Sequence, residues 1–365
     1  MAITRLNNNA LGDTAKQEGI NFKNLIINGD MSIAQRGTSS SGQTTAGYKS
    51  LDRYRVNIDG LGTWTISQDS DVPTGQGFGY SQKFACTTAD ASPAAGDVVF
   101  FQQRLEGQML QHLKKGTSNA ESLTLSFWVK SNKTGTYIAE LYDNDNTRQI
   151  SKSYTISSSN TWEKKTLTYD GDTTGTLGND NGGSLYLFFW LASGTRYTSG
   201  TLSTSWGTPT DANRASGQVN LGDSSSNTFY ITGVQLEVGT SASDFEFLPY
   251  DVNLQRCYRY FYNWISGHIY GNIMMGRATN SSNARGVFQL PARMRTGPSL
   301  TANGNFRAVA DAEISGDGSG ISMARSATDT VYITFSYSGS MTTGQCTEMG
   351  ANNDVDAEIL FDAEI

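Results

Sequence analysis

The sequence predicts an all-β protein, built as an antiparallel β-sandwich followed by a second, smaller β domain. Short runs rich in β-branched and aromatic residues recur along the chain, and polar turns separate them. Apolar and polar residues alternate within several of these runs, whereas helix-period patterns are scarce. Glycine is abundant, with 39 residues, while hydrophobic residues at 37% and charged residues at 17% fall below usual globular values. A chain of this composition is rich in turns and short strands.

The length of 365 residues exceeds what one hydrophobic core usually serves, so more than one domain is expected. We predict an N-terminal arm at 1–22, a sandwich domain at 23–250 and a C-terminal β domain at 251–365. The arm has few apolar side chains, among them Ile3, Leu6 and Leu11. Both a frayed terminus and a segment that becomes ordered on docking to another protein fit this composition.

The clearest strand of the sandwich domain is the run 123–131. Its residues Leu123, Leu125, Phe127 and Val129 share one face, which indicates that one side of the strand packs on a core. Further strands are expected at 63–66, 80–84, 98–105, 135–142, 150–156 and 162–169. No helical segments separate most of these runs, so antiparallel pairing is favoured over an α/β sheet.

Several phrases of the chain resemble bacteriophage tail-fibre and related virion structural proteins. The run Asn24–Gly37 is expected to form a short apolar strand and an Asn-Gly turn, and in that family a similar phrase leads into a segment like Asp52-Arg-Tyr-Arg-Val56. The run Ser-Phe-Trp-Val-Lys-Ser at 126–131 recurs in the family, and the stretch 229–261 resembles its domain junction.

The opening strand also resembles that of jelly-roll carbohydrate-binding modules, and this resemblance implies a jelly roll for 23–250. Such modules often hold a structural calcium, helped by acidic residues on the last strand. The corresponding stretch here, Tyr230–Val234, lacks a pair of aspartates, so a calcium site is not carried over.

An aromatic row is predicted on the run 184–192, which is apolar on both faces. Four residues of alternate phase can fill the sandwich: Leu185, Leu187, Phe189 and Leu191. Tyr186, Phe188 and Trp190 then point outward, where carbohydrate-binding modules stack aromatic rings on sugars. The same row could instead be covered by a loop, by the second domain or by a neighbouring subunit. With the long loop 193–222, the glycan-binding candidates are Tyr186, Trp190, Tyr197 and Trp206.

The stretch 227–250 is predicted to be the closing strand of the sandwich and the exit to the next domain. Its apolar phase slips around Gly233, as at a β-bulge. One or two helical turns are expected near 254–262, and strands at 269–275, 286–290, 305–309, 330–337 and 357–365. The phrase 288–298 resembles a run in distal domains of tail proteins. Within it, Arg293 and Arg295 are receptor-contact candidates that could bind an acidic glycan or pair with acidic neighbours.

Little in the sequence points to catalysis or to a bound metal. His112 and His268 fall in different predicted domains, and a Gly-x-Ser-x-Gly elbow is absent. The run 170–175 imitates the start of a calcium loop, but Asn181 stands where an EF-hand needs a bidentate Glu, so an ordinary turn is favoured. The three cysteines are widely spaced and are expected to be small buried residues. We predict no catalytic residue, no metal and no cofactor.

The net charge of -7 and a pI near 5.0 argue against nucleic acid or an anionic membrane as a partner. An apolar run near the ~20 residues that span a bilayer is absent, so membrane insertion is not expected. With no leader sequence evident, we expect synthesis in a host cytoplasm.

The resemblance to phage proteins implies a non-enzymatic tail fibre or fibre-tip subunit, located in the virion. The N-terminal arm would attach it to other tail or virion proteins, and the distal domain would meet a host-surface glycan or receptor. Because such fibres are usually trimers, a homotrimer is expected. Two alternatives remain: a tail-associated polysaccharide depolymerase, whose carboxylate spacing a sequence cannot reveal, and a purely structural head-decoration or tail-adaptor protein.

Overall fold

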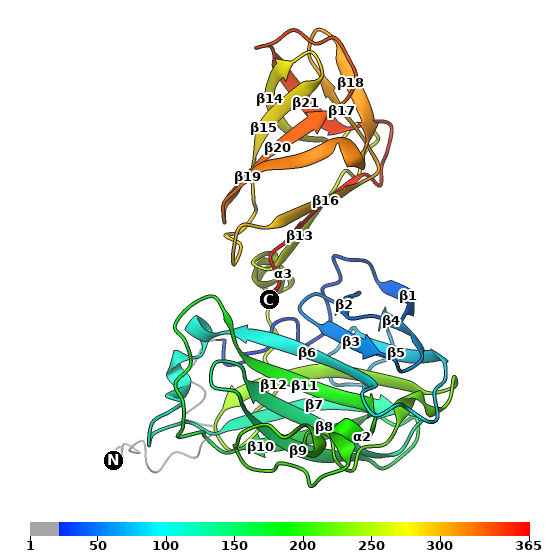
Figure 1. The fold of residues 1–365 in the computed structure, drawn as a ribbon, viewed down its shortest axis with the longest axis vertical. Coiled ribbons are helices and arrows are strands. Elements are labelled where there is room, and N and C mark those ends of the chain that lie inside the picture. The colour runs from blue at the N-terminus through cyan, green and yellow to red at the C-terminus, as the bar shows by residue number, and fades with distance from the viewer. Residues whose placement is uncertain (1–21) are drawn as a thin grey trace, which may run out of the picture. The chain divides into compact units, whose positions relative to one another are not determined.

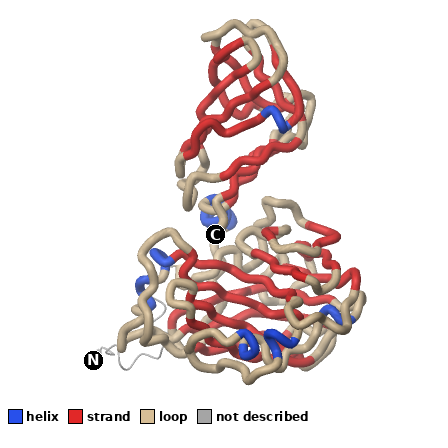
Figure 2. The backbone as a smooth tube through the Cα atoms, viewed as in Figure 1, coloured by secondary structure: helices blue, strands red, loops and turns tan. Residues whose placement is uncertain are grey.

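The computed structural model describes residues 22–365, and the chain divides into two compact units, one ending at Tyr250 and the other beginning at Asp251. Strands account for 44% of the residues and helices for 8%, so the all-β prediction is confirmed. Figure 2 shows that strands dominate both units and that the helices are short. The predicted attachment residues Ile3, Leu6 and Leu11 lie outside the described residues.

The first unit is an antiparallel jelly-roll sandwich of two sheets (Figure 1). One sheet, called sheet A here, has the strand order β1 (Ser39–Gln43), β4 (Thr63–Asp69), β5 (Ser81–Thr88), β12 (Thr228–Val238), β7 (Leu123–Ser131) and β10 (Glu163–Tyr169). The other, sheet B, has the order β2 (Gly47–Tyr48), β3 (Arg55–Asp59), β6 (Val98–Glu106), β11 (Gly183–Ser193), β8 (Gly135–Asp143) and β9 (Arg148–Ile156). Short 3-10 turns lie at Gly107–Met109, Gln111–Leu113, Asp211–Asn213 and Leu221–Asp223.

A column of phenylalanine rings joins the two sheets through the core. Phe84 of sheet A stacks on Phe101 of sheet B at 4.8 Å between ring centroids, and Phe101 stacks on Phe189 of the same sheet at 4.8 Å. Phe127 of sheet A meets Phe189 edge to face at 5.2 Å. All of these rings are fully buried. Aromatic burial on this scale supplies much of the free energy that holds the sheets together.

Strand β11 confirms the predicted division of its two faces. Leu185, Leu187, Phe189 and Leu191 belong to the core between the sheets. Tyr186, Phe188 and Trp190 belong to a second apolar cluster on the outer side of sheet B. The strict alternation of side chains along a strand produces this division, and it is the first step in building the site described below.

The opening segment differs from its prediction. Residues 24–27 do not form a strand; they lie buried in irregular backbone, and the first strand begins at Ser39. Side-chain amides replace part of the ladder: the Ile27 N–H donates to Gln103 Oε1 at 2.7 Å, and Gln103 Nε2 donates to the Ile27 carbonyl at 2.9 Å. Asn24 Nδ2 likewise donates to the Val234 carbonyl at 3.1 Å. The Leu25 N–H also donates to the Leu236 carbonyl of β12 at 2.9 Å. Because side-chain amides and this backbone contact satisfy polar groups here, the segment is buried without forming a strand.

The closing strand β12 contains the predicted bulge. Its register with β7 shifts between Thr232 and Gln235, and Gly233 adopts a φ of 62°. A Cβ atom at Gly233 would lie 2.6 Å from Cζ of Phe78, so both the backbone and the packing require glycine there. Beyond the strand, Phe245 and Phe247 pack on Phe78, each with its ring centroid 5.1 Å from that of Phe78.

Helix α3 (Tyr250–Tyr258) overlaps the helical turns expected near 254–262, but Phe261 and Tyr262 lie in a strand instead. The helix leads into the second unit, which continues as two antiparallel sheets. The smaller has the order β13 (Phe261–Ile265), β22 (Glu358–Asp362) and β16 (Ser299–Asn303). The larger has the order β18 (Glu313–Asp317), β17 (Asn305–Val309), β21 (Cys346–Ala351), β14 (Asn272–Asn280), β15 (Asn283–Gln289), β20 (Thr330–Ser336) and β19 (Ile321–Ser326). A 3-10 turn at Gly318–Gly320 joins β18 to β19.

The second unit has its own hydrophobic core. Ile359 and Phe361 of the last strand are fully buried and pack in this core, as their alternation with acidic residues predicts. One cysteine expectation is wrong: Cys86 and Cys257 are buried, but Cys346 is exposed. Cys346 begins β21 with its side chain on the face opposite to that of buried Thr347 and faces solvent.

Candidate functional site

A groove of about 350 Å³ lies on the outer face of sheet B. Its lining comes from β3, β6, β8 and β11, together with the loop 193–222. Residues on these strands that alternate with the core residues must point into the groove. The groove is therefore a direct product of the alternation on four neighbouring strands.

The strand register arranges the outward side chains in rows that cross the strands. From β3 toward β8, the rows are Asn57, Phe100, Trp190 and Ile138; Arg55, Gln102, Phe188 and Glu140; and Arg104, Tyr186 and Tyr142. Neighbouring strands lie ~4.8 Å apart, so residues within a row are in lateral contact. Aromatic rings occupy the middle of the face, and polar groups gather on β3 and β6.

A buried ion pair lies at the β8 side of the groove. Glu140 is fully buried, and its carboxylate accepts hydrogen bonds from Trp190 Nε1 at 2.7 Å and from Arg214 Nε at 3.0 Å. Burial raises the pKa of Glu140, although Arg214 and Trp190 both favour its charged form. The Arg214 guanidinium also lies over the rings of Trp190 at 5.1 Å and Phe188 at 5.3 Å.

The loop 193–222 covers part of the aromatic row. It contains helix α2 (Thr195–Thr198), from which the Tyr197 ring reaches to 5.3 Å from that of Trp190. Trp190 is 0% exposed and Phe188 6% exposed, so neither offers a free ring face to a ligand. These two side chains form a fixed floor, and the covering loop is one of the interpretations that the sequence left open.

The row of Arg104, Tyr186 and Tyr142 presents half-buried rings beside charged groups. Tyr142 and Tyr186 are partly exposed, with ring centroids 6.3 Å apart. The Arg104 guanidinium lies 4.9 Å from the Tyr186 ring centroid. Burial, followed by repulsion from Arg104, lowers the pKa of Arg55 on the neighbouring strand. Gln102 lies between these two arginines but is buried, so the partly exposed side-chain donors next to the aromatic surfaces are Arg55 and Arg104.

The structure brings together three of the four glycan-binding candidates. Tyr186, Trp190 and Tyr197 all line the groove, Trp190 as floor and the two tyrosines with exposed surface. Trp206 does not line it. Its Nε1 donates to the Asp170 carbonyl at 2.7 Å, and its ring packs under Lys115 at 5.3 Å.

The polar side of the groove was not predicted from the sequence. Arg55, Asn57, Gln102 and Arg104 come from strands that precede the aromatic row by more than 80 residues. Their signal in the sequence is the alternation of each with a core residue, as in Phe101-Gln102-Gln103-Arg104-Leu105. This alternation shows that they face outward but not which strand lies beside them.

The run 170–175, whose sequence is like the start of a calcium loop, forms ion pairs with basic side chains of the protein. Asp172 accepts hydrogen bonds from Arg148 Nε at 2.7 Å and Nη2 at 2.9 Å, and Lys115 Nζ lies 2.9 Å from it. Burial alone would raise the pKa of Asp172, but the hydrogen bonds from Arg148 and Lys115 outweigh this effect and lower it. Lys115 also pairs with buried Asp143. The run 170–175 is thus part of an internal ion network.

Within residues 22–365, no group of three or more His, Cys, Asp or Glu side chains is placed to hold a metal ion. In the same range, no helix has the length and apolar character required to cross a membrane.

The two receptor-contact candidates of the second unit have different environments. Arg293 is exposed, and its Nε donates to Thr328 Oγ1 at 3.2 Å. Arg295 is half-buried and donates to the carbonyls of Ala363 at 2.8 Å and Glu364 at 2.9 Å. Arg295 thereby ties the end of the chain to the unit, a structural role that leaves less of its guanidinium for a ligand.

Comparisons with known proteins yield only distant structural likenesses. No protein-family model matches the chain, and no curated protein matches it. Among solved structures, the enzymatically active domain of bacteriophage CBA120 tailspike protein 4 aligns with 16% identity and a TM-score of 0.31, over 60% of this chain and 22% of that one. A putative sugar-binding protein from Bacteroides thetaiotaomicron aligns with 14% identity and a TM-score of 0.30, over 59% of this chain and 100% of that one. A structure described as "CBM4 structure and function" aligns with 12% identity and a TM-score of 0.29, over 58% of this chain and 98% of that one. These scores are too low to support conclusions about function.

Proposed function

We propose that the chain is a non-enzymatic, glycan-binding subunit of a bacteriophage tail fibre, and that sheet B carries its glycan-binding groove. One observation carries the proposal: the partly exposed rings of Tyr142 and Tyr186 lie beside the partly exposed Arg55 and Arg104 in one concave surface. Ligand sites commonly combine apolar surface with a few convergent polar groups. The face of a sugar ring offers apolar C–H groups, and its edge offers hydroxyls, so both parts of the groove have a partner.

Each part of the groove then has a separate role. The Arg104 guanidinium on the next strand lies over the Tyr186 ring, and the part of this ring that stays exposed provides a stacking surface for a sugar. Arg55, which is partly exposed, donates hydrogen bonds to hydroxyl oxygens. The buried Trp190–Glu140–Arg214 group holds the floor rigid, which limits the entropy lost when a sugar binds.

The phage assignment is supported by the phrases at 24–37, 52–56, 126–131 and 229–261, which resemble tail-fibre and virion proteins. In this proposal, the N-terminal arm attaches the chain to other tail proteins, and the unit from Asp251 onward is distal. Association into a homotrimer would place three grooves on one particle component. Weak binding at each groove would then be strengthened by avidity.

Binding to immobilised host-surface polysaccharide tests the groove directly. We expect Tyr186→Ala to weaken binding by about tenfold, the equivalent of ~1.4 kcal/mol, because it removes a partly exposed ring from the groove. Tyr230→Ala is the matched control, since Tyr230 is a half-buried tyrosine on the outer face of sheet A, where Lys83 and Lys130 lie over its ring. Equal loss in both variants would contradict the assignment of the groove.

Two further measurements test the biological role. Excess purified protein should block adsorption of the phage to its host, and the Tyr186→Ala variant should block it less well. Incubation with the same polysaccharide should release no new reducing ends. Their release would replace the non-enzymatic proposal with that of a depolymerase.

A further inference from the structure

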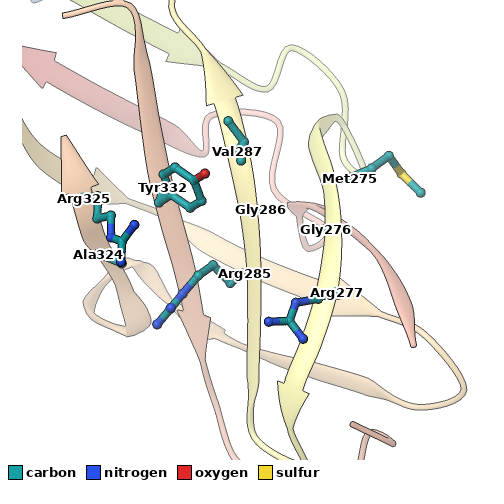
Figure 3. Close-up of a pocket in the computed structure, with 9 residues that line it drawn as sticks. All are labelled: Met275, Gly276, Arg277, Arg285, Gly286, Val287, Ala324, Arg325 and Tyr332. Carbon is teal, nitrogen blue, oxygen red and sulfur yellow. The ribbon is translucent and has the colours of Figure 1, made fainter. Parts of the chain in front are cut away.

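A second exposed site lies on the larger sheet of the second unit, on the face formed by β14, β15, β20 and β19. Three arginines, Arg277, Arg285 and Arg325, surround a hollow of about 520 Å³, and Figure 3 shows their side chains grouped on this face. The other large side chains that line the hollow are those of Met275, Val287 and Tyr332. We call these six residues the arginine face.

The strand register fixes the positions of the three charges. Arg277 on β14 lies directly opposite Arg285 on β15, and Arg325 on β19 lies opposite Tyr332 on β20. Tyr332 in turn lies opposite Val287 on β15. With strands ~4.8 Å apart, the charges are distributed over three strand spacings, on the order of 14 Å. A polymer that crosses the strands could therefore meet all three.

The charges on this face are not neutralised by the protein. Within the described part of the chain, none of the three arginines forms an ion pair. Arg285 Nε donates to Thr334 Oγ1 at 3.1 Å, and the Arg325 guanidinium lies 5.9 Å from the Tyr332 ring centroid. Like charges directly opposite each other on neighbouring strands are destabilising. A bound anion would relieve the repulsion between Arg277 and Arg285.

The one carboxylate that the register places beside this face is already engaged. Glu348 on β21 lies opposite Met275 and accepts a hydrogen bond from Asn272 Nδ2. It lies at the β21 side of the face, away from Arg325 on β19. The remaining strands of the face therefore present arginine without a competing acid.

Apolar surface lies among these charges. Met275 is 62% exposed, Val287 48% and Tyr332 39%. A purely solvated basic patch needs no such surface, whereas a sugar ring can cover it with its C–H face. The combination of guanidinium groups with an exposed aromatic ring suits a ligand that carries both acids and sugar rings.

We propose that the arginine face binds an acidic polysaccharide, with Arg277 and Arg285 holding one acidic group and Arg325 another. The unit from Asp251 to Ile365 contains eight arginines, no lysine and eleven acidic residues, so its net charge is negative. Nucleic acid, which needs a broad positive surface, fits this unit less well. The arginine face does not depend on the groove of sheet B, and either site can fail while the other stands.

The test compares charged polymers with their uncharged counterparts on the full chain. Polygalacturonate and dextran sulfate should bind, and methyl-esterified polygalacturonate and dextran should bind at least about tenfold more weakly at the arginine face. The Arg277→Gln/Arg285→Gln double variant should lose about tenfold in affinity for the charged polymers, and binding should weaken as salt is raised. Because both side chains are exposed and repel each other, thermal melting of the double variant should match or exceed that of the parent.

Arg293→Gln provides the matched control, since Arg293 is another exposed arginine of the same unit that does not line the hollow. It should leave binding unchanged. Failure of both charged polymers to bind would overturn the proposal, and so would an equal loss with Arg293→Gln. A single-stranded oligonucleotide bound as tightly as the polymers, with the same loss in the double variant, would replace polysaccharide with nucleic acid as the ligand. Retention of this binding in Tyr186→Ala separates the result from that for the groove.

Discussion

At the scale of single residues, the structure depends on charges that are buried with their partners. Glu140 is fully buried, and Arg214 is the only cation that forms an ion pair with it within residues 22–365. Removing one partner of a buried pair leaves the other uncompensated in a medium of low polarity. We therefore expect Arg214→Met to lower the free energy of unfolding by about 3–5 kcal/mol.

Urea unfolding measures this loss, and Arg196→Met on the same loop is its control. Arg196 is exposed and pairs with Asp211 at the surface, where water screens the interaction, so its replacement should change stability little. Similar midpoints for the two variants would show that burial of Glu140 does not govern its energetic role.

The ion pairs of Asp172 should make the free energy of unfolding fall as the pH is lowered. Its pKa is lowered in the folded chain, because hydrogen bonds from Arg148 and Lys115 outweigh the cost of burial. A lowered pKa means that the stabilisation is present above the ordinary Asp pKa of about 3.9 and is lost as pH falls through the lower, folded value. We expect Asp172→Asn to cost about 3 kcal/mol at pH 7. The difference from the parent should shrink below about pH 4, as followed by urea unfolding across pH. A difference that stays constant with pH would contradict this account.

At the scale of elements, the bulge in the closing strand β12 depends on a single glycine, Gly233. Gly233→Ala would place a methyl group against the Phe78 ring and force an L residue to a φ of 62°. We expect a loss of about 1–3 kcal/mol in thermal or urea unfolding. Gly79→Ala is the control, because no atom lies within 4 Å of a Cβ built there. Equal stability of the two variants would show that the bulge tolerates other residues.

Strands were predicted well where the alternation of apolar and polar residues within one strand shows which side chains face the core. The two faces of β11, the slip at Gly233 and the buried alternation of β22 are all properties of contiguous residues. The strands β1, β2, β3, β13, β16, β18, β19 and β21 were missed, and each has at most six residues, several of them small or polar. The opening segment was misassigned because Gln103, more than 70 residues away, satisfies its backbone.

The candidate sites depend on register, which a single sequence does not contain. The groove joins β3 and β6 to β11, and the arginine face joins residues from 275 to 332. Tyr186 could be identified because its own strand shows that it points outward. Arg104 and Arg277 could not, since their significance comes from the residues opposite them on other strands.

At the scale of the whole molecule, two separate cores predict two units that fold independently. The core of the first unit draws on residues 25–236, and that of the second on residues 274–363. Produced alone, 22–250 and 251–365 should each unfold cooperatively. Calorimetry of the full chain should resolve two transitions that match the fragments. A fragment that fails to fold would show that its core needs the other unit.

The exposed thiol of Cys346 gives the second unit a natural attachment point for a probe. Cys346 lies opposite Arg277 in the β14–β21 register, while the chain's other two thiols are buried. A maleimide fluorophore should therefore couple at one position of the folded protein, at the border of the arginine face. Its emission would report on the local environment of that face without any engineered residue, and the buried thiols would become reactive only on unfolding.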